Sequence, residues 1–170
     1  MAAHQGKGPA APVSRESAAK NTHNTVYALL TREMPEGRVL DVPCGSGAFT
    51  RRLLAGGYKT VAADIVHHPA LPEVAFETAD MNERLPFEAG SFDAVVSIDG
   101  IEHIRRPCDF VSECSRILRP GGLLLLTTAN ISAIRSRWRW FLTGFHNKDK
   151  YPLDEAHPQP RHHISMIGFP

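Results

Sequence analysis

Two glycines and an aspartate in the segment VLDVPCGSGAFT (residues 39–50) have the types and spacing of a ligand-binding loop. Apolar Val39 and Leu40 lead to Asp41, then Gly45 and Gly47 flank a serine, and a helix is expected to begin directly afterwards. A strand, a tight glycine turn and a helix N-terminus present backbone N–H groups to the polar end of a ligand. The segment therefore predicts a site for a nucleotide-like ligand.

Further residues at the ends of apolar segments could complete this site. Asp64 follows Asp41 by 23 residues, a separation that lets a carboxylate accept hydrogen bonds from both ribose hydroxyls. Asp80 and Ile98 end the next two apolar segments. Taken singly, Asp64 could cap a loop, Asp80 could cap a turn at Asn82, and the glycines could serve the turn alone. Their concentration at one edge of a predicted sheet favours a binding site.

Alternating strands and helices must position these residues. The expected strands cover residues 38–42, 58–65, 74–80, 91–98 and 123–129, and the expected helices cover 17–34, 48–55, 131–144 and a segment from Pro107 to the break at Pro120-Gly121-Gly122. This alternation predicts an α/β fold, with an open parallel sheet covered by helices on both faces. In such a sheet, ligands bind beyond the carboxyl ends of the strands.

Two nucleotide cofactors compete for this edge. A dinucleotide site requires G-x-G-x-x-G, because the third glycine lets the helix pack closely on the strand. Here GSGAF is followed by Thr50, so the third glycine is missing. The signal for NAD is therefore weak.

Five motifs in order resemble those of class I S-adenosylmethionine-dependent methyltransferases. Among these enzymes, the motifs are most similar to those of the small-molecule branch. The motifs are VLDVPCGSG, AADI, TADM, FDAVVSIDGIEHI and SRILRPGGLLLLTT, and they cover about residues 39–128. The resemblance implies a Rossmann-like open sheet in the order 3-2-1-4-5 with S-adenosylmethionine as cofactor. Family members usually add a C-terminal antiparallel hairpin. We expect this hairpin to be missing here and the chain to be truncated.

The resemblance also implies which residues of the glycine loop contact the cofactor. Asp41, Cys44, Gly45 and Gly47 would line its methionine end, and Gly45 would let the backbone approach. Pro43 departs from the family, which more often has glycine there. Because proline lacks an N–H donor, a backbone contact at this position is in doubt.

The remaining cofactor contacts come from the other strand ends. By resemblance, Asp64 would accept bonds from the ribose hydroxyls and Ile65 would pack on the adenine. Asp80 would accept from the adenine amino group, while the Met81 amide would donate to a ring nitrogen. Ile98 would close the pocket near the sulfonium.

Methyl transfer from a sulfonium requires positioning more than an elaborate catalytic group. An oxygen acceptor would still benefit from a base, and His103 is the candidate because its unperturbed pKa is near neutral. Glu102 and His103 could instead order the loop or contact the cofactor. Two adjacent residues do not make a coordination sphere, so no metal is expected. Cys108 is expected to be a core cysteine rather than a nucleophile.

Composition and motifs limit which partners and which cellular compartment can be expected. The net charge of +1 and the absence of an Asn/Asp-Pro-Pro-Tyr/Phe motif after the fourth strand argue against a nucleic-acid partner. Three cysteines without a C-x-x-C pair, and no apolar signal core, favour the cytoplasm. We expect a flexible lead over 1–16, the cofactor-binding methyltransferase domain over 17–130, and a basic, aromatic helix with a Pro- and His-rich tail over 131–170.

The C-terminal segment could cap the substrate pocket or bind an anionic or lipid-linked acceptor at a membrane surface. It could equally be a helix packed on the sheet with solvated arginines. His157, His162 and His163 fit a loop better than a metal site. The sequence thus predicts a methyltransferase acting on a small molecule or on a saccharide or lipid-linked acceptor, with oxygen as the preferred target. The alternative is a non-catalytic binding module of the same fold.

Overall fold

The computed structural model describes residues 21–67, 74–130 and 134–143. The elements are α1 (Thr22–Glu33), β1 (Arg38–Asp41), α2 (Ala48–Ala55), β2 (Lys59–Asp64), β3 (Ala75–Thr78), β4 (Phe92–Ile98), the short 3-10 helix η1 (Ile101–His103), α3 (Pro107–Ile117), β5 (Leu118–Thr127) and α4 (Ile134–Thr143). The predicted alternation holds in part: helices stand before β1, between β1 and β2 and between β4 and β5, whereas in the described ranges no helix separates β2, β3 and β4.

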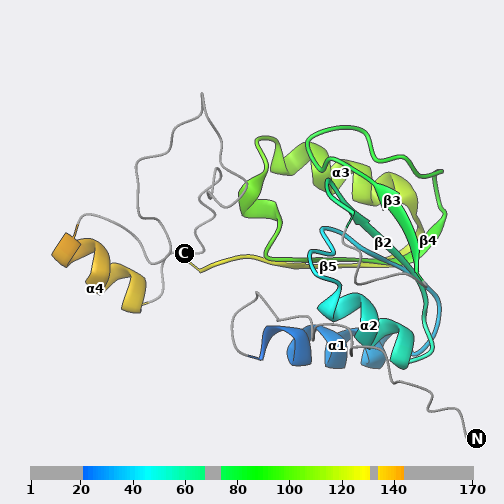
Figure 1. Ribbon diagram of the computed structural model, residues 1–170, viewed down its shortest axis with the longest axis horizontal. Helices are drawn as coiled ribbons and strands as arrows, with labels where there is room; N and C mark the ends of the chain where they lie inside the picture. Colours follow the sequence, from blue (N-terminus) through cyan, green and yellow to red (C-terminus); the bar gives the residue numbers. More distant parts are fainter. Residues whose placement is uncertain (1–20, 68–73, 131–133, 144–170) are drawn as a thin grey trace, which may run out of the picture.

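The five strands form one sheet in the order β3-β2-β1-β4-β5, and all four neighbouring pairs are parallel (Figure 1). In the centre of the sheet, Leu40 of β1 pairs with Val61 of β2 on one side and with Val95 of β4 on the other. The predicted open sheet and its strand order are confirmed. Because all strands run the same way, their carboxyl ends share one edge, where the order reverses between β1 and β4.

Helices cover both faces of the sheet, because adjacent strand residues point to opposite sides. The clusters of buried side chains show this. Helices α1 and α2 pack on one face, with Val26, Leu30, Phe49 and Leu53 against Val39, Ala94 and Val96. Helix α3 packs on the other face, with Phe110, Cys114 and Ile117 against Leu40, Val42 and Val95. Figure 1 shows the two layers. The sheet is thus covered by helices on both faces, as predicted.

The fifth strand begins earlier than predicted. The sequence placed its start at Leu123, after a break at Pro120-Gly121-Gly122, whereas β5 begins at Leu118. Between the pairs Phe92–Leu118 and Ala94–Leu123, β4 advances two residues while β5 advances five. Gly121 has a φ of 79°, which lets the extra residues bulge out of the ladder. The three residues therefore interrupt the strand rather than the helix.

Other predicted boundaries shift by a few residues or lie outside the described residues. The described part of the first helix begins at Thr22, and α4 lies inside the predicted segment 131–144. The expected lead over residues 1–16 and the His-containing tail lie outside the described ranges, as does any hairpin formed by residues 144–170. Within the described ranges, no helix combines the length and apolar character needed to cross a bilayer.

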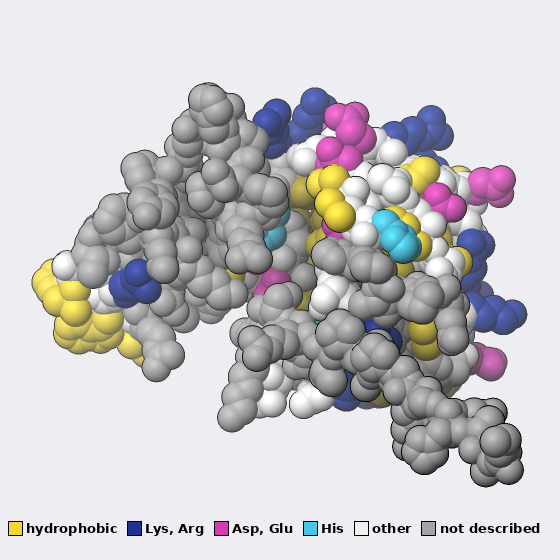
Figure 2. Space-filling model, in the orientation of Figure 1, with side chains coloured by type: hydrophobic (Ala, Val, Ile, Leu, Met, Phe, Trp, Pro, Cys, Tyr) yellow, Lys and Arg dark blue, Asp and Glu magenta, His cyan; other side chains and the backbone are white. Residues whose placement is uncertain are grey.

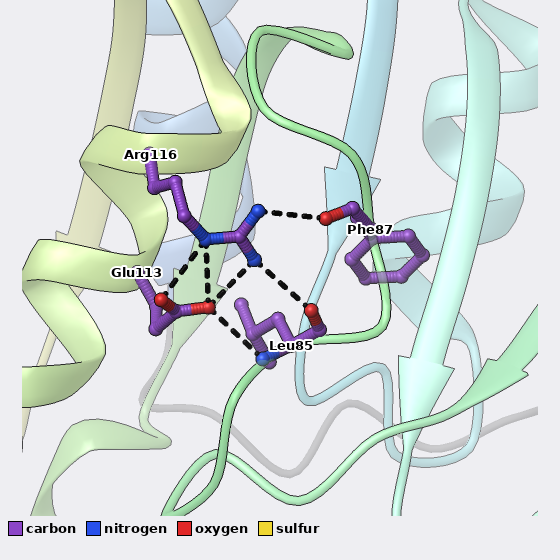
Figure 3. Close-up of polar contacts among 4 residues, drawn as sticks. All are labelled: Leu85, Phe87, Glu113 and Arg116. Carbon is purple, nitrogen blue, oxygen red and sulfur yellow. Dashed lines mark hydrogen bonds and ion pairs between the residues drawn. The ribbon is translucent and has the colours of Figure 1, made fainter.

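A polar cluster fixes the loop between β3 and β4 to helix α3 (Figure 3). The Arg116 guanidinium donates to the carbonyl oxygens of Phe87 and Leu85, at 2.8 and 3.0 Å. It also pairs with Glu113 at 2.7 Å, and the second partner of that carboxylate is the Leu85 N–H, at 3.1 Å. The hydrogen bond from Arg116 lowers the pKa of Glu113. This cluster anchors the loop that leads from the edge strand β3 back into the sheet.

Candidate active site

The glycine loop after β1 turns the chain sharply into helix α2. Gly45 and Gly47 have φ angles of 51° and 76°, in the left-handed region that favours glycine. Gly47 is the N-cap of α2, and its N–H donates to the Cys44 carbonyl at 2.9 Å. The Cys44 N–H in turn donates to Ala63 of β2 at 2.9 Å. These bonds hold the loop at the carboxyl edge of the sheet, where a ligand is expected.

Asp64, the last residue of β2, ties this loop to the neighbouring strand. Its Oδ2 accepts the Gly45 N–H at 2.8 Å, and its Oδ1 accepts the Ile65 N–H at 2.7 Å. The carboxylate therefore caps the loop, which is one of the two interpretations that the sequence allowed for Asp64. A carboxylate has about four lone-pair positions, so two acceptor positions remain for hydroxyl groups of a ligand.

Asp41, the last residue of β1, is a buried acid beside this loop. It is 1% exposed and accepts a hydrogen bond of 2.5 Å from the Thr50 hydroxyl of α2. Burial raises the pKa of Asp41 from 3.8 to about 7; the bond from Thr50 opposes this rise and the Asp64 carboxylate adds to it. A buried carboxylate without a cationic partner is costly, so this position favours a ligand that brings a positive charge.

A small cavity of about 40 Å³ opens between this acid and the loop. It brings together four predicted site residues: Asp41, Cys44, Gly45 and Ile98. The other lining residues are His23, Pro43, Ser46, Ala48 and Phe49. The sequence analysis missed His23, a buried residue of α1 whose ring lies edge-on to Phe49 at 5.4 Å. The one sequence signal for it is a polar residue on the apolar face that contains Val26 and Leu30.

The predicted adenine contacts lie at the ends of β2 and β3, outside this cavity. Ile65 is 62% exposed, next to the Asp64 carboxylate. Asp80 accepts from the Asn82 N–H at 2.8 Å and from its side-chain amide at 3.0 Å, so it caps that turn. The Met81 side chain is buried in the core on the α3 face. The structure therefore places these three residues at the expected edge without joining them to the cavity.

The turn after β4 positions the candidate base. Asp99 has a φ of 49°, and its carboxylate accepts from the Thr127 hydroxyl of β5 at 3.0 Å. The short helix η1 follows. There, Glu102 is buried and its Oε1 accepts the Ala129 N–H at 3.3 Å, while Oε2 has no hydrogen-bond partner among the described residues. His103 is half-buried on the same turn. In the part of the chain that the structure describes, no three His, Cys, Asp or Glu side chains are grouped to hold a metal ion.

The cysteines separate into buried and exposed ones. Burial, with the nearby carboxylates Asp41 and Asp64, raises the pKa of Cys44 to about 12. Burial also raises the pKa of Cys114 to about 12. Cys108 is exposed, so the expectation of a core cysteine is wrong. The buried positions of α3 are Phe110, Cys114 and Ile117, and Cys108 lies off this stripe in the first turn.

A larger cavity of about 380 Å³ lies at the opposite edge of the sheet. It is lined by the first residues of β1 and β3, by residues further along β2 and β3, and by the loop before β4: Arg38, Val61, Ala75, Glu77, Pro86, Phe87, Glu88 and Ser91. Ligands of open parallel sheets bind at the carboxyl ends of the strands. The smaller cavity, beside the glycine loop, is therefore the candidate site.

Comparison with known proteins gives relatives for most of the chain that forms the sheet. Residues 40–126 match the family described as "Methyltransferase domain". The ubiquinone biosynthesis O-methyltransferase of Xanthomonas oryzae pv. oryzae is 30% identical over 116 residues, which are 61% of this chain and 48% of that protein. The chain spans about half the length of the curated relatives it matches.

Solved structures agree with the fold. A protein of Pyrococcus horikoshii OT3 is 32% identical, with a TM-score of 0.53 over 59% of this chain and 54% of that one. The 1,6-didemethyltoxoflavin-N1-methyltransferase of Burkholderia thailandensis is 21% identical, with a TM-score of 0.55 over 60% of this chain and 50% of that one. That enzyme was crystallised with 1,6-didemethyltoxoflavin and S-adenosylhomocysteine. At this identity the likeness concerns the fold alone.

Proposed function

This chain belongs to the class I S-adenosylmethionine-dependent methyltransferase family, and on that premise we propose that it binds S-adenosylmethionine and methylates an oxygen atom of a small molecule. The observation that carries the proposal is the bond between the Gly45 N–H and Asp64, which unites the glycine loop and an acidic strand end at the carboxyl edge of the sheet. Buried Asp41 lies beside that loop. This carboxylate-lined edge suits a ligand that carries a sulfonium and an ammonium group.

The residues at this edge form groups, and we assign each group to one part of the cofactor. We assign its methionine end to Asp41, Cys44, Gly45 and Gly47, its ribose and adenine to Asp64, Ile65, Asp80 and Met81, and closure near the sulfonium to Ile98. Support comes from their common place at the ends of β1, β2, β3 and β4. The exposed Ile65 leaves an apolar surface beside the hydroxyl-binding carboxylate, where a flat apolar base could pack.

When bound, S-adenosylmethionine would supply an electrophilic methyl group for in-line attack by the acceptor oxygen, with S-adenosylhomocysteine as the neutral leaving group and the hydroxyl proton left to be taken up by the protein. His103, on the turn after β4, is the group we propose to take this proton. Asp99 and Thr127 would hold the turn in place through their 3.0 Å bond. Most of the rate enhancement is then positional, which can contribute about 7–11 kcal/mol.

We also propose the chemical class of the methyl acceptor. We favour a hydroxyl-bearing small molecule, and extend the choice to saccharides and lipid-linked acceptors because the basic, aromatic segment follows the domain. The proposed organisation keeps residues 17–130 as the methyltransferase domain, 1–16 as a lead and 131–170 as the substrate-proximal segment. We propose the cytoplasm as the compartment, since the cysteine pattern fits a reducing environment.

Calorimetric titration with S-adenosylmethionine, with NAD as the control ligand, tests the proposal. We expect S-adenosylmethionine alone to bind. Ile65→Ala should weaken binding about tenfold, because it removes apolar contact with the adenine. Val111→Ala, a matched exposed apolar residue on α3, should leave the affinity unchanged.

Release of S-adenosylhomocysteine with hydroxyl-bearing acceptors then tests turnover. With an active acceptor, His103→Gln should lower kcat while cofactor affinity stays the same. Binding of S-adenosylmethionine without turnover on any acceptor would favour the non-catalytic module instead. Binding of NAD, or of neither ligand, would contradict the assignment of this edge.

A further inference from the structure

Helix α4 presents four large apolar side chains to solvent. Ile134, Trp138, Phe141 and Leu142 are 75%, 63%, 75% and 73% exposed. They follow one another at i, i+4, i+7 and i+8, which places them on one face of the helix. Trp138 and Phe141 also touch edge-to-face, with ring centroids 6.2 Å apart. In Figure 1, α4 lies beyond the carboxyl end of β5, away from α1, α2 and α3, and Figure 2 shows the apolar patch at that end.

Positive charge borders this apolar face. At about 100° per residue, Arg137 and Arg139 fall on its two opposite sides. The sequence of α4, IRSRWRWFLT, contains three arginines and no acidic residue. Figure 2 shows dark blue side-chain atoms, the colour of Lys and Arg, beside the yellow patch. An apolar face bordered by arginines on both sides is the pattern of helices that lie in the plane of a membrane surface.

We propose that α4 docks this protein on an anionic lipid surface. Its aromatic and aliphatic side chains would enter the boundary between headgroups and acyl chains, while the arginines bind lipid phosphates. Two properties favour lipid over a protein partner. The charge on the helix is uniformly positive, and tryptophan and arginine are the side chains suited to a membrane interface. The inference goes beyond methyl transfer and does not depend on it.

The chain carries its own reporter for this contact. Its two tryptophans, Trp138 and Trp140, both lie in α4. Tryptophan fluorescence of the full chain, excited at a wavelength that tyrosine does not absorb, therefore reports on this helix. On addition of phosphatidylglycerol-containing vesicles we expect a blue shift of the emission, quenching by brominated lipid, and co-sedimentation. Pure phosphatidylcholine vesicles and raised salt should give much weaker binding.

Variants of surface residues on α4 assign the binding to this helix. Phe141→Ala with Leu142→Ala keeps both tryptophans and should lower vesicle affinity at least about tenfold, since each side chain loses its apolar transfer. Arg137→Gln with Arg139→Gln should lower it about fivefold for each charge removed. The controls are Leu54→Ala on α2, and Arg32→Gln with Lys59→Gln, which removes the same charge from other surfaces. The controls should bind like the wild type.

Three outcomes would overturn the proposal. The first is no change in fluorescence or sedimentation with anionic vesicles. The second is vesicle binding that the α4 substitutions leave intact, which would place the contact elsewhere. The third is a concentration-dependent mass that the Phe141→Ala, Leu142→Ala variant abolishes, which would mean that a second copy covers the face. None of these outcomes bears on cofactor binding, which calorimetry measures separately.

Discussion

Replacing Asp41 with asparagine should make the ligand-free protein more stable at neutral and alkaline pH. The pKa of this buried acid rises from 3.8 to about 7 on folding, so folding favours the protonated form. The stability contributed by the acid is fully present below about pH 4 and is lost as the pH rises through about 7. Asparagine stays neutral throughout and still offers an oxygen to the Thr50 hydroxyl.

The magnitude follows from the size of this shift. At about 1.4 kcal/mol per pKa unit, the raised pKa of Asp41 costs the folded state about 4 kcal/mol at pH 8, where the buried acid is ionised, and about 2 kcal/mol at pH 5, where folding protonates it. The new amide adds a cost that does not depend on pH. The free energy of unfolding of Asp41→Asn, relative to the wild type, should therefore fall by about 2–3 kcal/mol between pH 8 and pH 5.

Urea unfolding followed by far-ultraviolet circular dichroism at a series of pH values measures this difference. Asp109→Asn is the control, because its carboxylate is exposed and pairs with Arg106 at 3.4 Å on the surface. Its difference from the wild type should stay within about 0.5 kcal/mol across the series. A stability difference for Asp41→Asn that does not change with pH would refute the reasoning.

The same variant also tests the role of the acid toward the ligand. If Asp41 faces the cationic methionine end, Asp41→Asn should bind S-adenosylmethionine less tightly while being more stable without it. Unchanged affinity in the calorimeter would remove Asp41 from the cofactor site. A residue that lowers stability and raises ligand affinity is the pattern expected at a functional position.

Three further predictions concern the contacts that hold the edge and the loops in place. Arg116→Gln should lower the free energy of unfolding by about 2–3 kcal/mol, because it removes charged hydrogen bonds to two backbone carbonyls, whereas the exposed Arg106→Gln should cost no more than about 0.5 kcal/mol in the same urea assay. Glu113→Gln should make the free energy of unfolding depend less on pH in acid. The pKa of Glu113 is lowered on folding, so the stability that its carboxylate contributes is present above the unfolded pKa and is lost as the pH falls through the folded pKa. Thr127→Val should cost about 1–2 kcal/mol and increase amide hydrogen exchange around Asp99, since the Thr127 hydroxyl both donates to the Asp99 carboxylate and accepts from the Asp99 N–H, each at 3.0 Å. Unchanged exchange would mean that the turn does not depend on this hydroxyl.

The sequence predicted the sheet well, because its signals are local. Runs such as Val39–Val42 and Ala94–Ile98 fix which residues form buried strands, and the glycine loop fixes where the first strand turns into a helix. The motifs of the family supplied the strand order. The bulge at Pro120-Gly121-Gly122 escaped prediction, since proline and glycine break a helix and bulge a strand equally well.

The sequence by itself therefore determined the main strands and helices and the acidic residues at the strand ends. The hydrophobic periodicity that predicts a strand or a helix involves only residues that are close together in the sequence. Only the tertiary structure decided the partners: Asp64 with Gly45, 19 residues away, and Asp99 with Thr127, 28 residues away. It also brought buried His23 from α1 to the cavity and left the apolar face of α4 uncovered. Such pairings depend on the register of parallel strands and on which helix face is buried, and these are fixed when distant segments pack together.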